Sequence, residues 1–332
     1  MTNRRHGIWL IRRSLAILIF LFLLVTQSWS AESLYESSGE LLSVSIDDSM
    51  TISVPETDRQ IPLRVVYPEA GGPFPVIILS HGTFSSGKKY DPVATHWAAR
   101  GYVVVLPDHI DANYGVVPTK NDDMYRVSRS RVADMSILLN RLDEIESGIP
   151  GLEGRMKQQQ VIAAGHSFGT QVAMLVTGLR IKNPTNQAIT QSDETGFSLL
   201  VMLSDPGKMA LMPEDTWMGS TVPTFLATGT EDYGLMGDGN RVAEFQNEIL
   251  SLGDAPDADQ YLLLIDKGDH YFGGLIHKTV DSEPDHEGLE IFNATSTAFL
   301  DAYAKNDSDA RNYLRSGTLL RDTDGRAALT VE

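Results

Sequence analysis

Residues 161–175 read VIAAGHSFGTQVAML, and this stretch decides the fold. Its first four residues form a continuous apolar run, which is typical of a strand buried on both faces of a parallel sheet. The pattern G-x-S-x-G follows from Gly165 to Gly169, and 170–175 continues as a helix. A Cβ at either glycine would clash in so sharp a turn, so the pattern indicates a strained strand-to-helix turn that exposes the Ser167 hydroxyl. Ser167 is therefore the predicted nucleophile, at a helix N-terminus whose dipole favours developing negative charge.

Strand and helix patterns alternate on both sides of this turn. Alternating or continuous apolar runs predict strands at 41–46, 50–54, 61–67, 76–79, 102–106, 161–164, 199–203, 223–227 and 261–265. Apolar residues at helical spacing predict amphipathic helices over 127–145, 242–252 and 289–303. We therefore expect a single α/β domain over 31–332, with a mostly parallel sheet of about eight strands and helices on both faces. No polar insertion is long enough for a large lid.

A serine nucleophile needs a base, and His270 is the predicted one. It follows the last apolar run, in the glycine-containing loop 266–271, which can deliver an imidazole to the carboxyl edge of a sheet. His81 is expected to be a buried histidine that bonds its own loop. His277 and His286 are expected to be surface or packing histidines, and His166 is held in the turn beside the nucleophile. The other three lie elsewhere: His6 in the N-terminal segment, His96 in a predicted helix and His109 after an earlier strand.

The base needs an acid to orient it, and Asp232 is the preferred residue. It ends the strand-like run 223–227 and gives the chain order Ser, Asp, His. Asp205 ends the previous run and remains an alternative, although it could equally cap a turn. Glu231 is a minor candidate, and Asp269 cannot easily turn back onto its neighbour.

An acyl-transfer site also needs two backbone N–H groups aimed at one oxyanion. One is predicted to be that of Phe168, directly after the nucleophile. The other is predicted to be that of Thr83, in the loop Ser80-His81-Gly82-Thr83-Phe84 that follows the run 76–79, where Gly82 allows close approach.

The first thirty residues differ from the rest in composition. Four arginines precede an apolar run at 15–25, and small residues stand at Ser28 and Ser30, as in a secretory signal peptide. A run near eleven residues is too short to span a bilayer, so we expect signal cleavage after Ser30, no stable membrane span, and export to the periplasm or beyond.

Composition narrows the function further. Without those four arginines the chain carries 23 basic and 44 acidic residues, a net charge of about −21, which argues against nucleic-acid partners. The absence of cysteine excludes disulfides, a thiolate metal site, a cysteine nucleophile and a lipid anchor on cysteine. Nothing in the sequence points to a cofactor, and its oligomeric state is left open.

These motifs resemble α/β-hydrolases of the platelet-activating-factor acetylhydrolase and dienelactone-hydrolase-like group. The resemblance covers about residues 60–305 and rests on Ser80-His81-Gly82, Leu106 to Asp111, Arg131 to Asp134, the turn at Ser167, Gly229 to Asp232 and His270. It implies hydrolysis of short acyl esters, small or lipid-like, without metal or organic cofactor. By position, Ser167, Asp232 and His270 would form the triad, with Thr83 and Phe168 as oxyanion donors. Peptide cleavage, acyl transfer and a non-catalytic binding role remain alternatives on the same fold.

Overall fold

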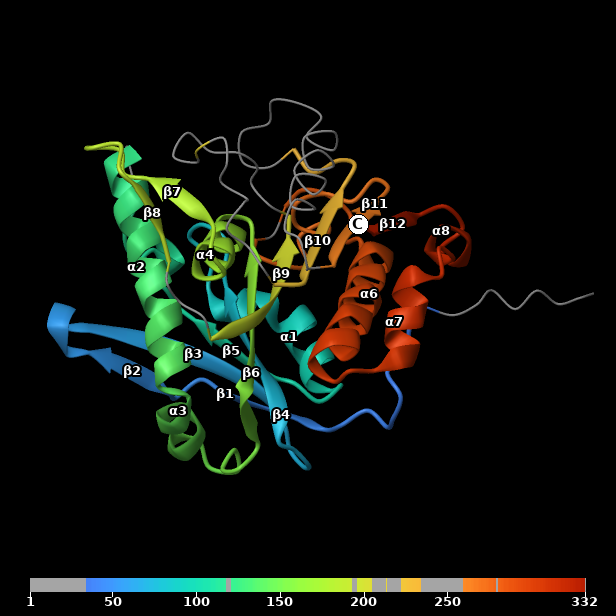
Figure 1. Cartoon of the computed structure of the whole chain (residues 1–332), viewed down its shortest axis with the longest axis horizontal. Helices are drawn as coiled ribbons and strands as arrows, with labels where there is room; N and C mark the ends of the chain where they lie inside the picture. The colour runs from blue at the N-terminus through green and yellow to red at the C-terminus, as the bar shows by residue number, and fades with distance from the viewer. Residues whose placement is uncertain are drawn as a thin grey trace, which may run out of the picture. The chain divides into compact units, whose positions relative to one another are not determined.

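The apolar runs of the sequence become the strands of one large sheet (Figure 1). The computed structural model describes residues 34–117, 121–192, 196–204, 213, 222–233, 259–278 and 280–331. Within them, ten strands pair in the order β1-β3-β5-β4-β6-β9-β10-β11-β12, with β2 beside β3. The strands are β1 (Val44–Asp47), β2 (Thr51–Val54), β3 (Arg59–Pro68), β4 (Phe74–Ser80), β5 (Val103–Pro107), β6 (Met156–His166), β9 (Phe197–Leu203), β10 (Thr224–Gly229), β11 (Gln260–Ile265) and β12 (Ala327–Val331).

The middle of the sheet is parallel, and its two edges are antiparallel. Strands β5, β4, β6, β9, β10 and β11 run parallel, whereas β1, β2 and β3 on one side and β12 on the other pair antiparallel. The register aligns His166 with Leu203 and Gly229 with Ile265. Residues that follow these strands therefore lie along one edge of the sheet, where ligands bind in open α/β folds.

Helices cover both faces of this sheet. They are α1 (Asp91–Ala98), α2 (Asn121–Asn140), α3 (Leu142–Gly148), α4 (Phe168–Val176), α6 (His286–Ala304), α7 (Ser308–Arg315) and α8 (Leu319–Asp322). Along β4, Val76 and Ile78 pack in the core with α2, α3 and α4, while Ile77 and Leu79 pack in the core with α1 and α6. This alternation explains why the run is apolar throughout, because both faces of the strand are covered.

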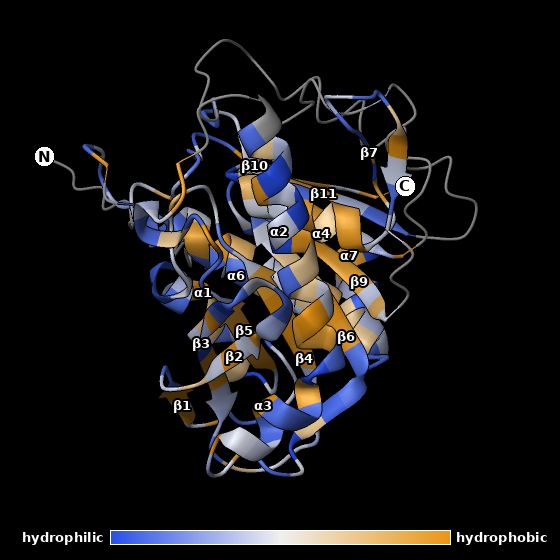
Figure 2. Cartoon of the chain, turned by 90° about the vertical axis from the view of Figure 1, so that its left-hand side faces the viewer, coloured by the Kyte–Doolittle hydropathy of each residue, from blue (hydrophilic) through white to orange (hydrophobic). Residues whose placement is uncertain are grey.

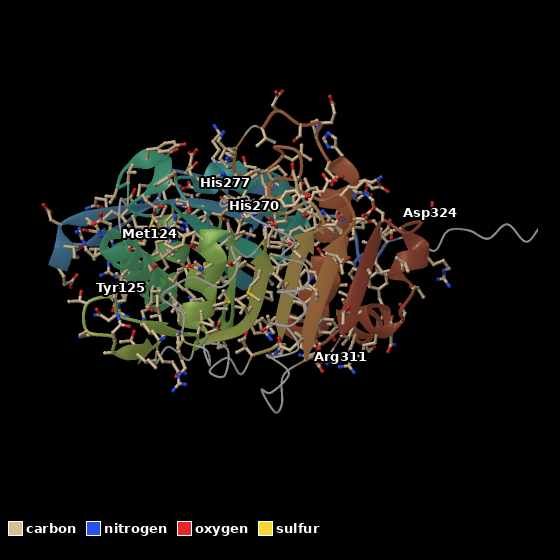
Figure 3. The ribbon with its side chains drawn as sticks, turned by 90° about the horizontal axis from the view of Figure 1, so that it is seen from above. Met124, Tyr125, His270, His277, Arg311 and Asp324 are labelled. Atoms are coloured by element: carbon tan, nitrogen blue, oxygen red, sulfur yellow. The ribbon has the colours of Figure 1, made fainter. Side chains whose placement is uncertain are left out.

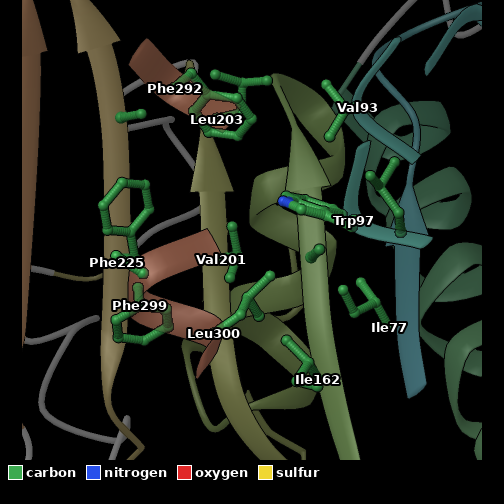
Figure 4. Close-up of a cluster of buried hydrophobic side chains, with 14 of the residues drawn as sticks. Ile77, Val93, Trp97, Ile162, Val201, Leu203, Phe225, Phe292, Phe299 and Leu300 are labelled. Carbon is green, nitrogen blue, oxygen red and sulfur yellow. The ribbon is translucent and has the colours of Figure 1, made fainter. Parts of the chain in front are cut away.

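The second of these cores is shown in close-up in Figure 4. Trp97 from α1, Phe225 from β10 and Phe292 from α6 meet there with Ile77 and Ile162. In Figure 2 the apolar strands lie inside, and hydrophilic residues colour much of α2 and α3. Burial of these faces is the main favourable contribution to folding.

The predicted α/β fold is confirmed, with differences at its margins. The helix predicted over 127–145 is broken at Arg141 into α2 and α3, and the helix predicted over 289–303 is α6. The sequence reading missed β12, α7 and the small hairpin of β7 (Arg180–Lys182) and β8 (Ile189–Gln191), which are short and partly exposed. The predicted helix over 242–252 and most of the polar insertion 204–222 lie outside the described residues, so the absence of a lid stays a prediction.

The sequence predicts a signal peptide over the first thirty residues and a single domain over 31–332. Ser33–Glu332 forms one compact unit. The predicted signal peptide lies outside the described residues. Among the helices that the structure describes, none combines the length and apolarity needed to cross a bilayer.

Candidate active site

Ser167 occupies a strained turn between β6 and α4. Its φ of 54° and ψ of −125° lie in a region that residues with a Cβ rarely adopt. A Cβ on Gly165 would lie 2.1 Å from the Gly169 carbonyl oxygen, and a Cβ on Gly169 would lie 2.0 Å from the Ser80 carbonyl oxygen. The predicted reason for both glycines is therefore confirmed. The Ser167 N–H donates to the Leu203 carbonyl at 3.0 Å, which ties the turn to β9.

The predicted base and acid are hydrogen-bonded to each other. His270 lies in the loop after β11, and its Nδ1 is 2.7 Å from Oδ1 of Asp232, which follows β10. Both residues are buried, each with 4% of its surface exposed. The second carboxylate oxygen of Asp232 accepts from the Thr228 hydroxyl at 3.0 Å. With the carboxylate as acceptor, His270 donates through Nδ1–H, which leaves Nε2 to receive a proton.

The electrostatics of Asp232 suit this arrangement. Burial alone would raise the pKa of its carboxyl group. Hydrogen bonds from His270, Ser204 and Thr228, together with the charge of His270, outweigh burial and hold that pKa below its ordinary value. Asp232 therefore remains ionised at neutral pH, which is the state that an orienting acid requires.

The two atoms predicted to react are both buried and both lack a hydrogen-bond partner in the described part of the chain. Within the described ranges, neither Ser167 Oγ nor His270 Nε2 has a hydrogen-bond partner, although both are buried. The two are therefore not hydrogen-bonded to each other in the structure. Their backbones are tied together nonetheless, because His166 Nε2 lies 2.9 Å from the His270 carbonyl oxygen and the two imidazoles are 4.8 Å apart.

His166 connects the nucleophile turn to the loop after β4. Its Nδ1 is 2.8 Å from the Tyr90 hydroxyl, which also accepts the Gly82 N–H at 2.9 Å. Because Nε2 must donate to the His270 carbonyl, Nδ1 accepts from Tyr90. Burial, with the nearby His270 and His277, holds the pKa of His166 well below its ordinary value and keeps the ring neutral. His277, from the segment after β11 (Figure 3), packs beside His166 with their ring centroids 5.4 Å apart.

The expectation for His81 is also confirmed. Its Nδ1 is 2.7 Å from the Gly82 carbonyl oxygen, and its Nε2 accepts the His109 N–H at 3.1 Å. Burial, followed by the charge of Arg131, keeps its pKa well below the ordinary value. His81 is therefore a neutral, fully buried residue that holds its own loop.

Three other residues were candidates for the acid that orients His270. Asp269 is occupied by the N–H groups of Tyr271 and Gly273, at 2.8 and 2.9 Å, so it caps its own turn. Glu231 is exposed. Asp205 lies outside the described residues.

The predicted oxyanion donors lie on neighbouring segments. A Cβ on Gly169 would also lie 2.8 Å from the His81 carbonyl oxygen, so the loop that carries Thr83 packs directly on the turn that carries Phe168. The role of Thr83 and Phe168 as oxyanion donors stays a prediction.

Sequence reasoning missed the charged support beneath this loop. Arg131 on α2 is completely buried and pairs with buried Asp111 at 2.6 Å. On the same helix Asp134 accepts from Nδ1 of His109 at 2.9 Å, and Nε2 of that histidine is 3.0 Å from the Ser80 hydroxyl. A signal was present, because Arg131 and Asp134 stand four and seven residues after Val127 on the helix face that is otherwise apolar. Charges on such a face are rare unless they are paired.

Within the part of the chain that the structure describes, no three histidine or acidic side chains are arranged to hold a metal ion.

Comparison with known proteins places this geometry in context. A family model described as Chlorophyllase matches residues 37–196. The matched segment includes Thr83, Ser167 and Phe168 and ends before Asp232 and His270. Among curated proteins, none matches the chain. The match supports a carboxylic-ester hydrolase in general, and together with the sheet it confirms the predicted resemblance: the fold is that of an α/β-hydrolase, and the chain is similar to the serine esterases of that fold.

Proposed function

We propose that this protein is an exported serine hydrolase that cleaves carboxylic esters of short acyl chains through an acyl-enzyme. The observation that carries the proposal is the buried Asp232–His270 hydrogen bond of 2.7 Å, beside a serine held at positive φ. His81 and His166 have both nitrogens satisfied. His270, His96 and His277 each keep one buried nitrogen with no partner among the described residues. Of these three, only His270 has its other nitrogen paired with a carboxylate in the described part of the chain.

In the first half of the proposed reaction, Ser167 Oγ attacks the ester carbonyl carbon. The hydroxyl proton moves to His270 Nε2, and ionised Asp232 stabilises the imidazolium that forms. The carbonyl oxygen becomes an oxyanion and accepts the N–H groups of Thr83 and Phe168. When the C–O bond breaks, the leaving alcohol takes the proton from His270. Water then attacks the acyl-enzyme by the same steps and restores Ser167.

The missing hydrogen bond between Ser167 and His270 fits this scheme. Catalytic hydrogen bonds in the free enzyme are often long or poorly aligned and shorten when substrate binds. A hydrogen bond already holds the two segments together, since the side chain of His166, the residue before the serine, donates to the His270 carbonyl. Substrate binding is therefore expected to bring Ser167 Oγ and His270 Nε2 into hydrogen-bond contact.

The test is a comparison of purified wild type with Ser167→Ala on nitrophenyl esters of increasing acyl length and on peptide amides. We expect wild type to be fastest on short esters and the variant to lose about 10⁶ in kcat. Dominant amide cleavage would move the function to peptidases, and transfer of the acyl group to added alcohols faster than to water would make the enzyme an acyltransferase. A serine variant as active as wild type would remove the proposal.

Export and short acyl specificity rest on the sequence. The basic start, apolar run and small residues up to Ser30 support signal cleavage, and insertions too short for a substantial lid support small substrates. Mass measurement of the protein from an expression host tests the first. A mature chain that begins at Ala31 in the periplasm or medium agrees with the proposal, and an intact N-terminus in the cytoplasm contradicts it.

A further inference from the structure

The side chain of Arg131 makes more contacts with one loop than its ion pair requires. Its guanidinium forms two hydrogen bonds with Asp111, through Nε at 2.8 Å and a terminal nitrogen at 2.6 Å. The same group donates to the carbonyl oxygen of His81, and to that of Gly82 at 3.3 Å. The arginine thus holds two consecutive carbonyls of the loop after β4, and the next residue is Thr83.

The hydrogen bonds of this loop are almost all satisfied inside the protein. The Gly82 N–H donates to the Tyr90 hydroxyl, and the Phe84 N–H donates to Asp111 Oδ2 at 3.3 Å. This leaves the Thr83 N–H without an acceptor among the residues that the structure describes. A backbone donor left free between such constrained neighbours has a fixed direction and is available to a ligand.

Arg131 also contacts the second predicted donor residue. Its guanidinium carbon lies 4.7 Å from the centroid of the Phe168 ring, as in a cation–π contact. Phe168 is buried, and it is the first residue of α4. One side chain therefore contacts both segments whose N–H groups would bind the oxyanion.

We propose that Arg131 is a positioning residue that sets the geometry of both oxyanion donors at once. Asp111 fixes the orientation of its guanidinium group through two hydrogen bonds. This inference rests on the proposed function, because it assigns no chemistry of its own to the arginine. Burial excludes a direct contact between the guanidinium and solvent, and its donors are already engaged. The arginine acts through the backbone of 81–84 and through the ring of Phe168.

The planar guanidinium group, with its five N–H donors, explains why this position holds an arginine. A lysine could pair with Asp111, but its single ammonium group cannot form two parallel hydrogen bonds, reach two carbonyls and lie over a ring together. An ion pair needed for folding alone would tolerate that exchange better than a pair that fixes two backbone donors.

The test compares Arg131→Lys with wild type and with Arg64→Lys as a matched control. Arg64 forms a similar two-bond pair with Asp91, at 2.6 and 2.8 Å, and none of its hydrogen bonds among the described residues goes to residues 81–84. We expect Arg131→Lys to lower kcat on the best nitrophenyl ester by about 10² to 10³, as loss of one oxyanion donor does. KM should stay within about threefold, and the pH midpoint of kcat/KM should not move. The control should retain wild-type kcat.

A transition-state analogue gives the readout that a merely structural role would not change. A trifluoromethyl ketone adds Ser167 Oγ to its carbonyl and forms an oxyanion, so its inhibition constant should rise in the same proportion as kcat falls. Binding of a substrate-like product acid should change little. Equal losses for analogue and product acid, or a folded variant with wild-type kcat, would overturn the inference.

Asp111→Asn keeps the test decisive if the lysine variant does not fold. The asparagine has the same shape, so the loop stays packed, but its hydrogen bonds to the Arg131 guanidinium are weaker than those of the carboxylate. We therefore expect kcat to fall about tenfold or more while KM is preserved. Unchanged kcat in that variant contradicts the positioning role. The Ser167→Ala variant separates the two proposals. If it retains activity, the proposed function fails. If it is inactive while Arg131→Lys and Asp111→Asn both match wild type, only the role of Arg131 fails.

Discussion

The two loops that meet at Ser167 are held by different means. The loop after β4, at 80–87, is fixed by buried side chains, chiefly the Arg131–Asp111 pair and the Tyr90 hydroxyl. The loop after β11, at 266–278, is fixed through its own backbone: the Gly268 carbonyl accepts the Glu231 N–H, the His270 carbonyl accepts from His166, and the N–H groups of Tyr271 and Gly273 donate to Asp269. A single carboxylate, Asp232, holds its imidazole.

This difference matches what each loop contributes to the proposed chemistry. An oxyanion hole uses backbone donors, which other side chains can only hold in place from outside. A general base uses a side chain, which needs one orienting partner and room to move a proton. We therefore expect changes at the base loop to affect proton transfer, and changes beneath the β4 loop to affect stabilisation of the transition state.

The largest effect is expected for Asp232→Asn. The amide cannot stabilise the imidazolium and favours the wrong tautomer of His270, so kcat should fall by about 10⁴ while the fold is kept. Steady-state kinetics on a nitrophenyl ester and circular dichroism measure the two quantities. A near-normal rate would move the acid role to Asp205.

Close packing of the two turns beside His270 predicts a loss of stability for Gly229→Ala. A Cβ there would lie 2.0 Å from the Gly268 carbonyl oxygen, so the backbone must move. We expect a loss of about 3 kcal/mol in the free energy of unfolding, measured by denaturant titration. Gly268→Ala is the comparison, because its Cβ would meet its nearest atoms only at 3.2–3.3 Å and should cost less. Equal losses of stability in the two variants would contradict the close contact between Gly229 and the Gly268 carbonyl.

The buried neutral histidines predict a pH dependence of stability. Burial lowers the folded-state pKa of His81 and His166 well below 6.5, so the unfolded chain binds more protons just below that pH. Their stabilising contribution is present above about pH 6.5 and is lost as pH falls toward the folded-state values, by up to about 1.4 kcal/mol per pH unit for each histidine. Denaturant titrations between pH 5 and 7 measure the slope. His166→Gln should reduce it and the exposed His286→Gln should not, and a slope unaffected by the first variant would contradict the assignment.

The smallest effect concerns the second oxygen of Asp232. Thr228→Val removes a donor to the carboxylate at 3.0 Å while preserving shape, and we expect kcat to fall about tenfold. Thr224→Val, at the opposite end of β10 and bonded to the Val222 carbonyl, is the control. A loss shared by both variants would indicate damage to the strand instead of loss of the hydrogen bond.

The central part of the fold could be predicted because its signals are local. Strands buried on both faces are continuous apolar runs, and the turn at Ser167 needs glycines at fixed positions. Short edge elements such as β12 carry no such signal, because partial exposure weakens both periodicity and hydropathy. The break of the long helix at Arg141 also has no clear local marker in the sequence.

The candidate site was predictable where residues follow strands, and not where they act from a distance. Ser167, Asp232 and His270 each stand after an apolar run, so topology alone brings them to one edge. Arg131 and Tyr90 reach the loop after β4 from helix α2 and from the segment before α1. Such contacts depend on how helices pack on the sheet, which spacing along the chain does not specify.

The central claim is that Ser167 is an activated nucleophile, and covalent labelling tests it most directly. Folded wild type treated with a fluorophosphonate should gain the mass of one adduct, and peptide mapping should place it on Ser167. The Ser167→Ala variant should gain none. A folded wild type that stays unlabelled, or an adduct on another residue, would contradict the account.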